Sequence, residues 1–147
     1  MARVALLDVN VLVALFCAEH VHHDLAHDWF ADHRDDGWAT CPVTENGFVR
    51  VVAQLAAGDA SLRPASILDR LAKFRRDPHH AFWPDAVSLT DRSLFEQALI
   101  RGHRQVTDVY LLGLARQKDA CLATFDGTIP LKSVVGATRG QLLVISA

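Results

Sequence analysis

Four carboxylates at widely separated points of the chain are the residues whose types and positions could do chemistry. They stand where an apolar stretch ends or where a helix is expected to begin, and they are Asp8, Glu45, Asp108 and Asp126. Carboxylate oxygens are hard ligands that suit Mg²⁺ and Mn²⁺. Two such ions can activate water and stabilise the leaving oxygen of a phosphodiester. If the fold gathers the four acids, the sequence predicts metal-dependent cleavage of phosphodiesters.

Asp8 has the most unusual surroundings of the four. It follows the apolar run 4–7 and is followed at once by a second run that begins at Val9. A short apolar run closed by a polar residue is typical of a buried strand that ends at the carboxyl edge of a sheet. Open α/β sheets place their ligands just beyond this edge. Because an unpaired acid between two apolar runs is costly to bury, the pattern favours a functional role for Asp8.

The other three acids have ordinary alternatives when each is taken alone. Asp126 precedes Gly127 and is typical of a turn, Asp108 is typical of a helix cap, and Glu45 is typical of a solvated first helical turn. These alternatives stay open from the residues alone. The functional interpretation depends on all four acids sharing one sheet edge, where carboxylates without metal repel one another and raise at least one pKa.

Strand-like and helix-like patterns alternate along the chain. Short apolar strands are expected at 3–7, 38–41, 80–83, 121–125 and 142–145. Helices are expected over 9–17, 23–34 and 109–118, after an N-cap at Thr44, near Pro64, and after a cap at Asp91 or Ser93. This alternation predicts an α/β fold with three layers, in which a short central parallel sheet carries helices on both faces. We expect residues 1–147 to form a single domain.

Composition places the chain among globular proteins. Half of the 147 residues are hydrophobic and 22% are charged, which is not a disordered composition. The start of the chain resembles neither a signal peptide nor an anchor, and no apolar stretch approaches a membrane span, so we expect a cytoplasmic protein. The three widely spaced cysteines are expected to be reduced and mostly buried. The net charge of −2 gives no positive support for a polyanionic partner.

Four segments carry a resemblance that spans residues 4 to 145. They are Leu7-Asp8-Val9-Asn10-Val11-Leu12, Thr44-Glu45-Asn46-Gly47, Thr107-Asp108-Val109-Tyr110-Leu111-Leu112 and Ala123-Thr124-Phe125-Asp126. In this order and spacing they resemble the PIN-domain nucleases, and within them the VapC-type toxins of bacterial type II toxin–antitoxin modules. The resemblance implies a PIN-like domain and a Mg²⁺- or Mn²⁺-dependent endoribonuclease in which the four acids hold the metal. It also implies that Asn10 and Thr124 support the site, and that the partners are an RNA substrate, a second copy in a homodimer and a cognate antitoxin.

Two basic segments of the chain could contact RNA. Arg101, His103 and Arg104 lie in a loop that leads directly to Asp108, so we hypothesise that Arg101 and Arg104 contact substrate phosphates. The second segment contains Arg75 and His80, and we expect it to be solvated surface.

Alternative functions stay open at this point. The histidines between His20 and His27 could hold zinc through the pair His23 and His27, or could cleave RNA without metal as acid and base, although a solvated role is expected. A phosphatase could use Asp8 as a covalent nucleophile, but Asn10 stands where a second acid would serve. A catalytically silent binding module is disfavoured by the intact set of four acids.

Overall fold

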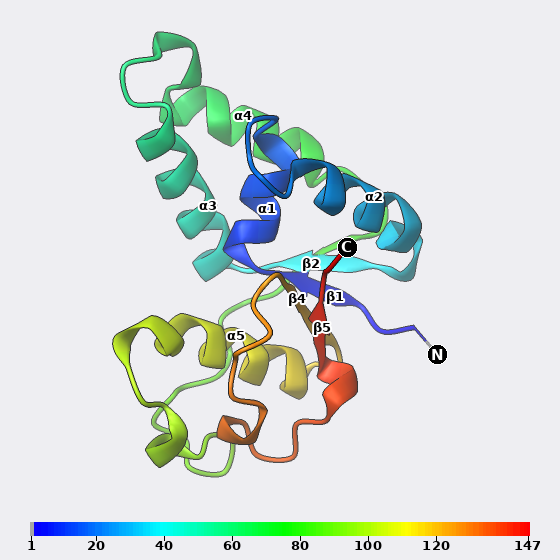
Figure 1. Ribbon diagram of the computed structural model, residues 1–147, viewed down its shortest axis with the longest axis vertical. Coiled ribbons are helices and arrows are strands. Elements are labelled where there is room, and N and C mark those ends of the chain that lie inside the picture. The colour runs from blue at the N-terminus through cyan, green and yellow to red at the C-terminus, as the bar shows by residue number, and fades with distance from the viewer. Residues whose placement is uncertain (1) are drawn as a thin grey trace.

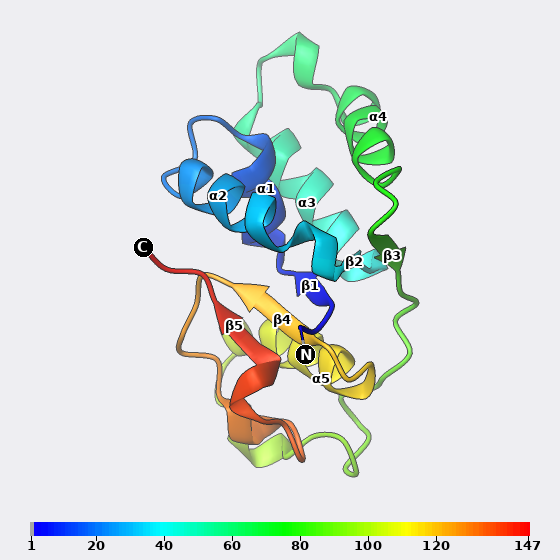
Figure 2. The ribbon, with the colours of Figure 1, turned by 90° about the vertical axis from the view of Figure 1, so that its right-hand side faces the viewer.

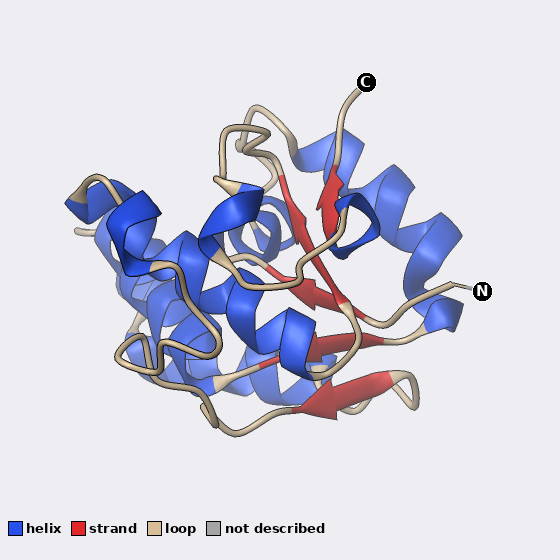
Figure 3. Cartoon of the chain, turned by 90° about the horizontal axis from the view of Figure 1, so that it is seen from below, coloured by secondary structure: helices blue, strands red, loops and turns tan. Residues whose placement is uncertain are grey.

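A five-stranded parallel sheet forms the centre of the fold. The computed structural model describes residues 2–147, apart from the side chain of Ala60. The strands are β1 (Ala5–Leu7), β2 (Trp38–Thr40), β3 (His80–Phe82), β4 (Cys121–Thr124) and β5 (Leu142–Val144), and they lie in the order β3-β2-β1-β4-β5. All four pairings are parallel. Figure 3 shows these short strands fanning out between the helices, with the twist usual for such a sheet.

Helices cover both faces of the sheet. The α-helices are α1 (Val9–Phe16), α2 (His23–His33), α3 (Pro42–Leu55), α4 (Pro64–Phe74) and α5 (Val106–Gln117). Figures 1 and 2 show α1 to α4 gathered on one side of the sheet and α5, with the segment that precedes it, on the other. The predicted three-layer α/β/α fold is therefore confirmed.

Each side of the sheet has its own apolar core. In β1, Ala5 and Leu7 belong to the core beneath α1 to α4, whereas Leu6 belongs to the core shared with α5. Successive side chains of a strand point to opposite faces, and both faces are covered, so every residue of β1 must be apolar. The central strands are consequently short apolar runs and not alternating patterns.

The expected start of the third helix was wrong by nearly one turn. Helix α3 begins at Pro42, with Cys41 as its N-cap, and Thr44 lies inside the first turn. The Thr44 hydroxyl accepts a hydrogen bond from the Cys41 N–H at 3.0 Å, so it caps the helix from within. Pro42 ends the strand and also suits the first helical position, because a helix leaves that N–H without a partner.

The helix expected after Asp91 or Ser93 is also wrong. The segment forms turns and one short 3₁₀ helix at Gln97–Leu99. Phe95 is buried in the core beside α5, and it forms an antiparallel bridge with Val134. This pairing with a distant segment uses backbone groups that a helix would need, so tertiary contacts override the local pattern.

All three cysteines are free, and Cys41 and Cys121 are buried. Within residues 2–147 no helix is both long enough and apolar enough to cross a membrane.

Candidate active site

The two acids that follow strands emerge at the same edge of the sheet. Strands β1 and β4 are parallel neighbours, with Leu7 opposite Ala123. The Asp8 N–H donates to the Ala123 carbonyl at 3.0 Å, which ties the end of β1 to β4. Asp126 follows the end of β4 by two residues, so both acids lie at the carboxyl edge of neighbouring strands.

Asp8 is a buried carboxylate that accepts two hydrogen bonds. It is 6% exposed, and it is also the N-cap of α1. Its Oδ1 accepts from the Val9 N–H at 2.7 Å, and its Oδ2 accepts from the Thr124 hydroxyl at 2.8 Å. Burial raises the pKa of Asp8, with a further rise from the negative charge of Asp126, although the two hydrogen bonds oppose it. The protein therefore holds a carboxylate where its charge is unfavourable.

Asp126, unlike Asp8, is exposed to solvent, and its carboxylate also stabilises a turn. Its Oδ1 accepts from the Thr128 N–H at 2.8 Å and from the Thr128 hydroxyl at 2.6 Å. Its own N–H donates to the Thr124 hydroxyl oxygen at 3.1 Å. Thr124 thus connects Asp8 with the backbone of Asp126. The turn interpretation of Asp126 is correct for one carboxylate oxygen and leaves the second oxygen available for a ligand.

Asp108 faces the same negative region from the opposite layer. It lies in the first turn of α5 and is half-buried. Burial, together with the charges of Asp8 and Asp126, raises the pKa of Asp108 to about 6. The three aspartates are therefore electrostatically coupled, and one raised pKa is the result expected for carboxylates crowded without metal.

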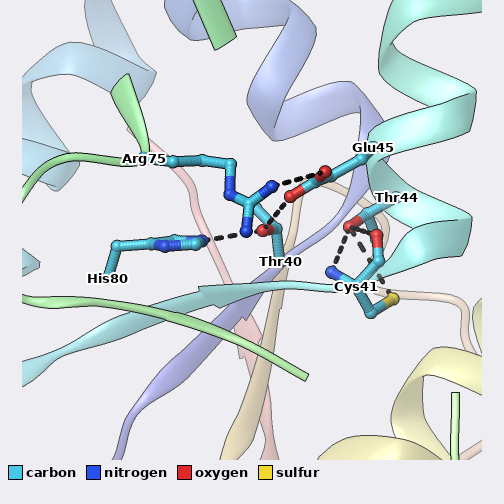
Figure 4. A network of polar contacts seen from close by, with 6 residues as sticks. All are labelled: Thr40, Cys41, Thr44, Glu45, Arg75 and His80. Atoms are coloured by element: carbon cyan, nitrogen blue, oxygen red, sulfur yellow. Dashed lines mark hydrogen bonds and ion pairs between the residues drawn. The ribbon is translucent and has the colours of Figure 1, made fainter. Parts of the chain in front are cut away.

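Glu45 belongs to a separate network of polar contacts, shown in Figure 4. It lies in the first turn of α3. Its Oε2 accepts from the Thr40 hydroxyl at 2.6 Å, and its Oε1 lies 3.4 Å from Nη1 of Arg75. Glu45 therefore has a cationic partner, unlike the aspartates, which form no ion pair within residues 2–147.

The hydrogen bond from Thr40 to Glu45 fixes the tautomer of His80. Thr40 Oγ1 lies 2.7 Å from His80 Nε2. Since the only hydroxyl proton of Thr40 is donated to Glu45, Nε2 of His80 must carry the proton and donate to Thr40. Burial and the charge of Arg75 lower the pKa of His80 to about 4, so the neutral ring is the form that donates at physiological pH.

The close approach of α3 to α1 brings Glu45 to the same edge as Asp8. Gly47 has no side chain, and a β-carbon there would lie 2.8 Å from a methyl group of Val9, the residue after Asp8. Glycine therefore allows the starts of these two helices to meet. No ion pair or hydrogen bond joins Glu45 directly to the aspartates among the contacts of residues 2–147.

The remaining site residues expected from the sequence lie at the surface. Asn10 is exposed in the first turn of α1. Arg101 and Arg104 are exposed in the segment before α5. Their suggested roles stay predictions.

Two of the histidines have structural partners. His23 Nδ1 lies 2.6 Å from the carbonyl of Ala14, and His27 Nε2 lies 2.8 Å from the carbonyl of Leu15. Both rings donate to the end of α1, where a helix has unpaired carbonyls. His27 is nevertheless exposed and His23 half-buried, so each ring combines contact with solvent and a structural hydrogen bond. A zinc site would have to use the other ring nitrogens.

A divalent ion fits the chemistry of the three aspartates. Within the described residues, no three His, Cys, Asp or Glu side chains are already gathered closely enough to hold a metal. Mg²⁺, however, commonly takes only one or two protein carboxylates and completes its shell with water and substrate phosphate. Asp8, Asp108 and Asp126 offer hard oxygen donors whose mutual repulsion a cation would relieve.

Thr40, Arg75 and His80 were missed as site residues by sequence reasoning. A signal was present for Thr40, because it ends β2 as Thr124 ends β4. No local pattern connects Arg75 or His80 with Glu45, since their contacts depend on the packing of α4 and β3.

Comparison with known proteins identifies the family. Residues 5–133 match the model of the PIN domain. Ribonuclease VapC44 of Mycobacterium tuberculosis is 40% identical over 96% of this chain and 99% of its own length. Ribonuclease VapC29 of the same organism is 46% identical over 82% of this chain and 84% of its own length.

Solved structures agree on the fold. VapC20 of Mycobacterium tuberculosis, described as a Sarcin-Ricin loop cleaving toxin, has a TM-score of 0.61 at 15% identity and covers 85% of this chain and 92% of its own. VapBC2 of Rickettsia felis, bound to a DNA fragment from its promoter, has a TM-score of 0.57 at 16% identity, covering 86% of this chain and 93% of its own. The sequence match and the fold agree with the resemblance found in the four acidic segments, and the chain belongs to the PIN-domain family and, within it, to the VapC proteins.

Proposed function

We propose that this protein is a toxin-type endoribonuclease that cleaves RNA with Mg²⁺ or Mn²⁺ held by Asp8, Glu45, Asp108 and Asp126. The substrate class is supported by the VapC relatives, which are named ribonucleases and are 40% or more identical to this chain. The site assignment is supported by the residues themselves.

One observation carries the proposal. Asp8 follows β1, Asp126 follows β4, and Asp108 lies in the first turn of α5. Burial and the negative charge of neighbouring aspartates raise the pKa of Asp8 and of Asp108. None of the three aspartates forms an ion pair with a cationic side chain within residues 2–147. Such an arrangement costs folding free energy unless a cation completes it. The N-cap role of Asp8 and the turn role of Asp126 do not explain why three acids that oppose one another's ionisation have no cationic partner among the described residues.

The chain's own residues have distinct parts in this proposal. Thr124 holds the Asp8 carboxylate with its hydroxyl, and it also accepts the N–H of Asp126, which fixes two ligands relative to each other. When bound, a divalent ion supplies the Lewis acidity that lets water attack the phosphodiester and leave a 5′-phosphate. Asn10, exposed beside Asp8, is proposed to support the site through its amide.

A pair of matched aspartates provides the test. Asp126 and Asp91 make the same turn contacts, because Asp91 Oδ1 accepts from the Ser93 N–H at 2.9 Å and from its hydroxyl at 2.6 Å. Asp126→Asn and Asp91→Asn thus remove the same kind of turn charge. Digests of total bacterial RNA with Mg²⁺, Mn²⁺ or EDTA should show that only Asp126→Asn loses cleavage, by about 100-fold or more.

The ends of the RNA products separate the proposal from its rivals. Water attack leaves a 5′-phosphate, whereas an enzyme that uses histidines and the RNA 2′-OH leaves a cyclic phosphate. Cleavage that persists in EDTA, or cyclic-phosphate ends, would reject the metal mechanism. Equal activity of the two aspartate variants would reject Asp126 as a ligand.

Two protein partners complete the proposal. Membership of the VapC proteins supports a cognate antitoxin that neutralises the toxin, and a homodimer. Co-expression with the product of a neighbouring open reading frame should relieve growth inhibition and yield a co-purifying complex. Light scattering of the purified protein should give twice the mass of 16.2 kDa. A monomer at micromolar concentration would contradict the dimer.

A further inference from the structure

Arg75 is the one arginine or lysine of residues 2–147 that forms an ion pair with a candidate metal ligand. Four ion pairs link residues of the described part of the chain, and only the pair of Arg75 and Glu45 includes a candidate metal ligand. Arg101 and Arg104, the basic residues expected from the sequence to contact RNA, are exposed and form no ion pair within residues 2–147. Figure 4 shows the Arg75 side chain extended towards Glu45.

An aromatic ring holds the guanidinium in position. The centre of the Arg75 guanidinium lies 4.6 Å from the ring centroid of Phe82. Phe82 is opposite Thr40 in the parallel pairing of β3 with β2, and Thr40 binds Glu45. The sheet register therefore sets the place of Arg75 relative to the carboxylate. Stacking on an aromatic face orients an arginine and leaves its N–H groups free to bind.

Most of the hydrogen-bonding capacity of Arg75 is unused. A guanidinium has five N–H donors, and the contact with Glu45 uses Nη1 at 3.4 Å, which is long for a charge-assisted hydrogen bond. The side chain is 37% exposed. The group is thus accessible from solvent, positively charged, and held only weakly by its carboxylate partner.

We propose that Arg75 binds a phosphate of the RNA substrate beside the scissile bond, exchanging Glu45 for the phosphate when substrate enters. The inference rests on the proposed endoribonuclease function and adds a substrate-binding residue to it. A phosphate accepts two parallel N–H groups of one guanidinium, whereas Glu45 offers a single long contact. The site is built from four carboxylates, so an arginine at its rim favours the approach of a polyanionic backbone.

The adjacent arginine supplies a matched control. Arg76 is exposed, and it makes no ion pair among residues 2–147. Arg75→Met and Arg76→Met change the net charge equally and keep similar side-chain length. The probe is a fluorescein-labelled RNA of about 20 nucleotides, centred on the cleavage site mapped in the total-RNA digest. KM is measured with Mn²⁺, and binding is measured by anisotropy in EDTA over a series of salt concentrations.

Arg75→Met should raise KM and weaken RNA binding by about tenfold or more, as expected for loss of a hydrogen bond between charged groups. The slope of the logarithm of the binding constant against the logarithm of salt concentration should fall in magnitude by about one for Arg75→Met. Arg76→Met should change either quantity by less than about threefold. Arg75→Lys, which keeps the charge without the fork of donors, should fall between Arg75→Met and wild type.

Two results would overturn the inference. If Arg75→Met and Arg76→Met weaken binding equally, the charge alone matters and Arg75 has no specific role. If Arg75→Met leaves RNA affinity unchanged but shifts the Mn²⁺ concentration for half-maximal activity, Arg75 only positions Glu45. Failure of the wild type to cleave RNA with Mn²⁺ would instead reject the proposed function, and the inference with it. Thermal unfolding verifies that each variant is folded. If Arg75→Met does not fold, Arg75→Lys replaces it in the comparison with wild type and Arg76→Met.

Discussion

The candidate site has an aspartate side, made of Asp8, Asp108 and Asp126, and a glutamate side, made of Glu45 and its partners. On both sides a threonine hydroxyl at the end of a strand donates to a carboxylate, but the electrostatic surroundings are opposite. On one side Thr124 ends β4 and donates to Asp8, and on the other Thr40 ends β2 and donates to Glu45. Asp8 faces other acids, and burial raises its pKa. Glu45 instead lies 3.4 Å from the Arg75 guanidinium.

The difference separates two roles for an acid in one site. The aspartate side is unfavourable without a cation, so it has the strongest reason to bind one. The glutamate side is already compensated by Arg75, so binding metal there requires exchange of partners. We therefore expect the aspartate side to dominate metal affinity and the glutamate side to link the metal centre to the substrate.

The largest contrast should be between Asp8→Asn and Glu45→Gln, which we expect to shift the melting temperature in EDTA in opposite directions. Asp8→Asn removes a buried charge from among like charges, so it should raise the melting temperature in EDTA. Glu45→Gln removes the carboxylate that pairs with Arg75, so it should lower the melting temperature slightly. Asp8→Asn should reduce cleavage by about 1,000-fold, since a metal ligand contributes several kcal/mol to transition-state stabilisation. Shifts of the same sign in both melting temperatures would break the comparison.

The pH dependence of stability tests the aspartate side alone. An unfolded Asp titrates near pH 4, and Asp108 titrates at about 6 in the folded protein. Between these values the folded state holds more protons than the unfolded state, so the free energy of unfolding falls as pH rises. Subtracting the melting profile of Asp108→Asn from that of the wild type in EDTA should isolate this loss between about pH 4 and 6. Saturating Mn²⁺ should restore more stability at pH 7.5 than at pH 5, and a flat difference would contradict the raised pKa.

Removing each threonine hydroxyl should give a smaller contrast. Thr124→Val leaves a buried oxygen of Asp8 without its donor, whereas Thr40→Val leaves Glu45 with Arg75. We expect Thr124→Val to weaken Mn²⁺ binding by about 10- to 100-fold, as is usual for a group that orients a metal ligand. Thr40→Val should weaken it less, and the serine variants, which keep the hydroxyl, should behave like wild type. Calorimetry of Mn²⁺ binding makes the measurement, and a larger effect at Thr40 would reverse the assignment of the two sides.

The sequence predicts the sheet and the aspartate side because both depend on local patterns. Short apolar runs identify the five strands, and Asp8 and Asp126 follow two of them. The alternation of strands with helices then predicts a parallel sheet, in which β1 and β4 share a carboxyl edge. Pairing of β1 with β4 is a property of the whole fold, yet only a few strand orders satisfy the chain connections.

The contacts of Arg75 and His80 with the glutamate side could not be predicted, because they join distant segments. Arg75 and His80 reach Glu45 and Thr40 only after α4 packs against α3 and β3 pairs with β2. The segment after Asp91 shows the same limit, since Phe95 pairs with Val134 in place of the helix that its local pattern favours. Side-chain partners across a fold are set by packing, which periodicity does not encode.

Diffraction from a crystal grown with Mn²⁺ tests the central claim most directly, because the anomalous signal of manganese locates the ion without reference to the protein. The account predicts a peak within ligand distance of an Asp8 carboxylate oxygen and bordered by Asp108 and Asp126. No peak at saturating Mn²⁺, or a peak only at His23 and His27, would contradict it.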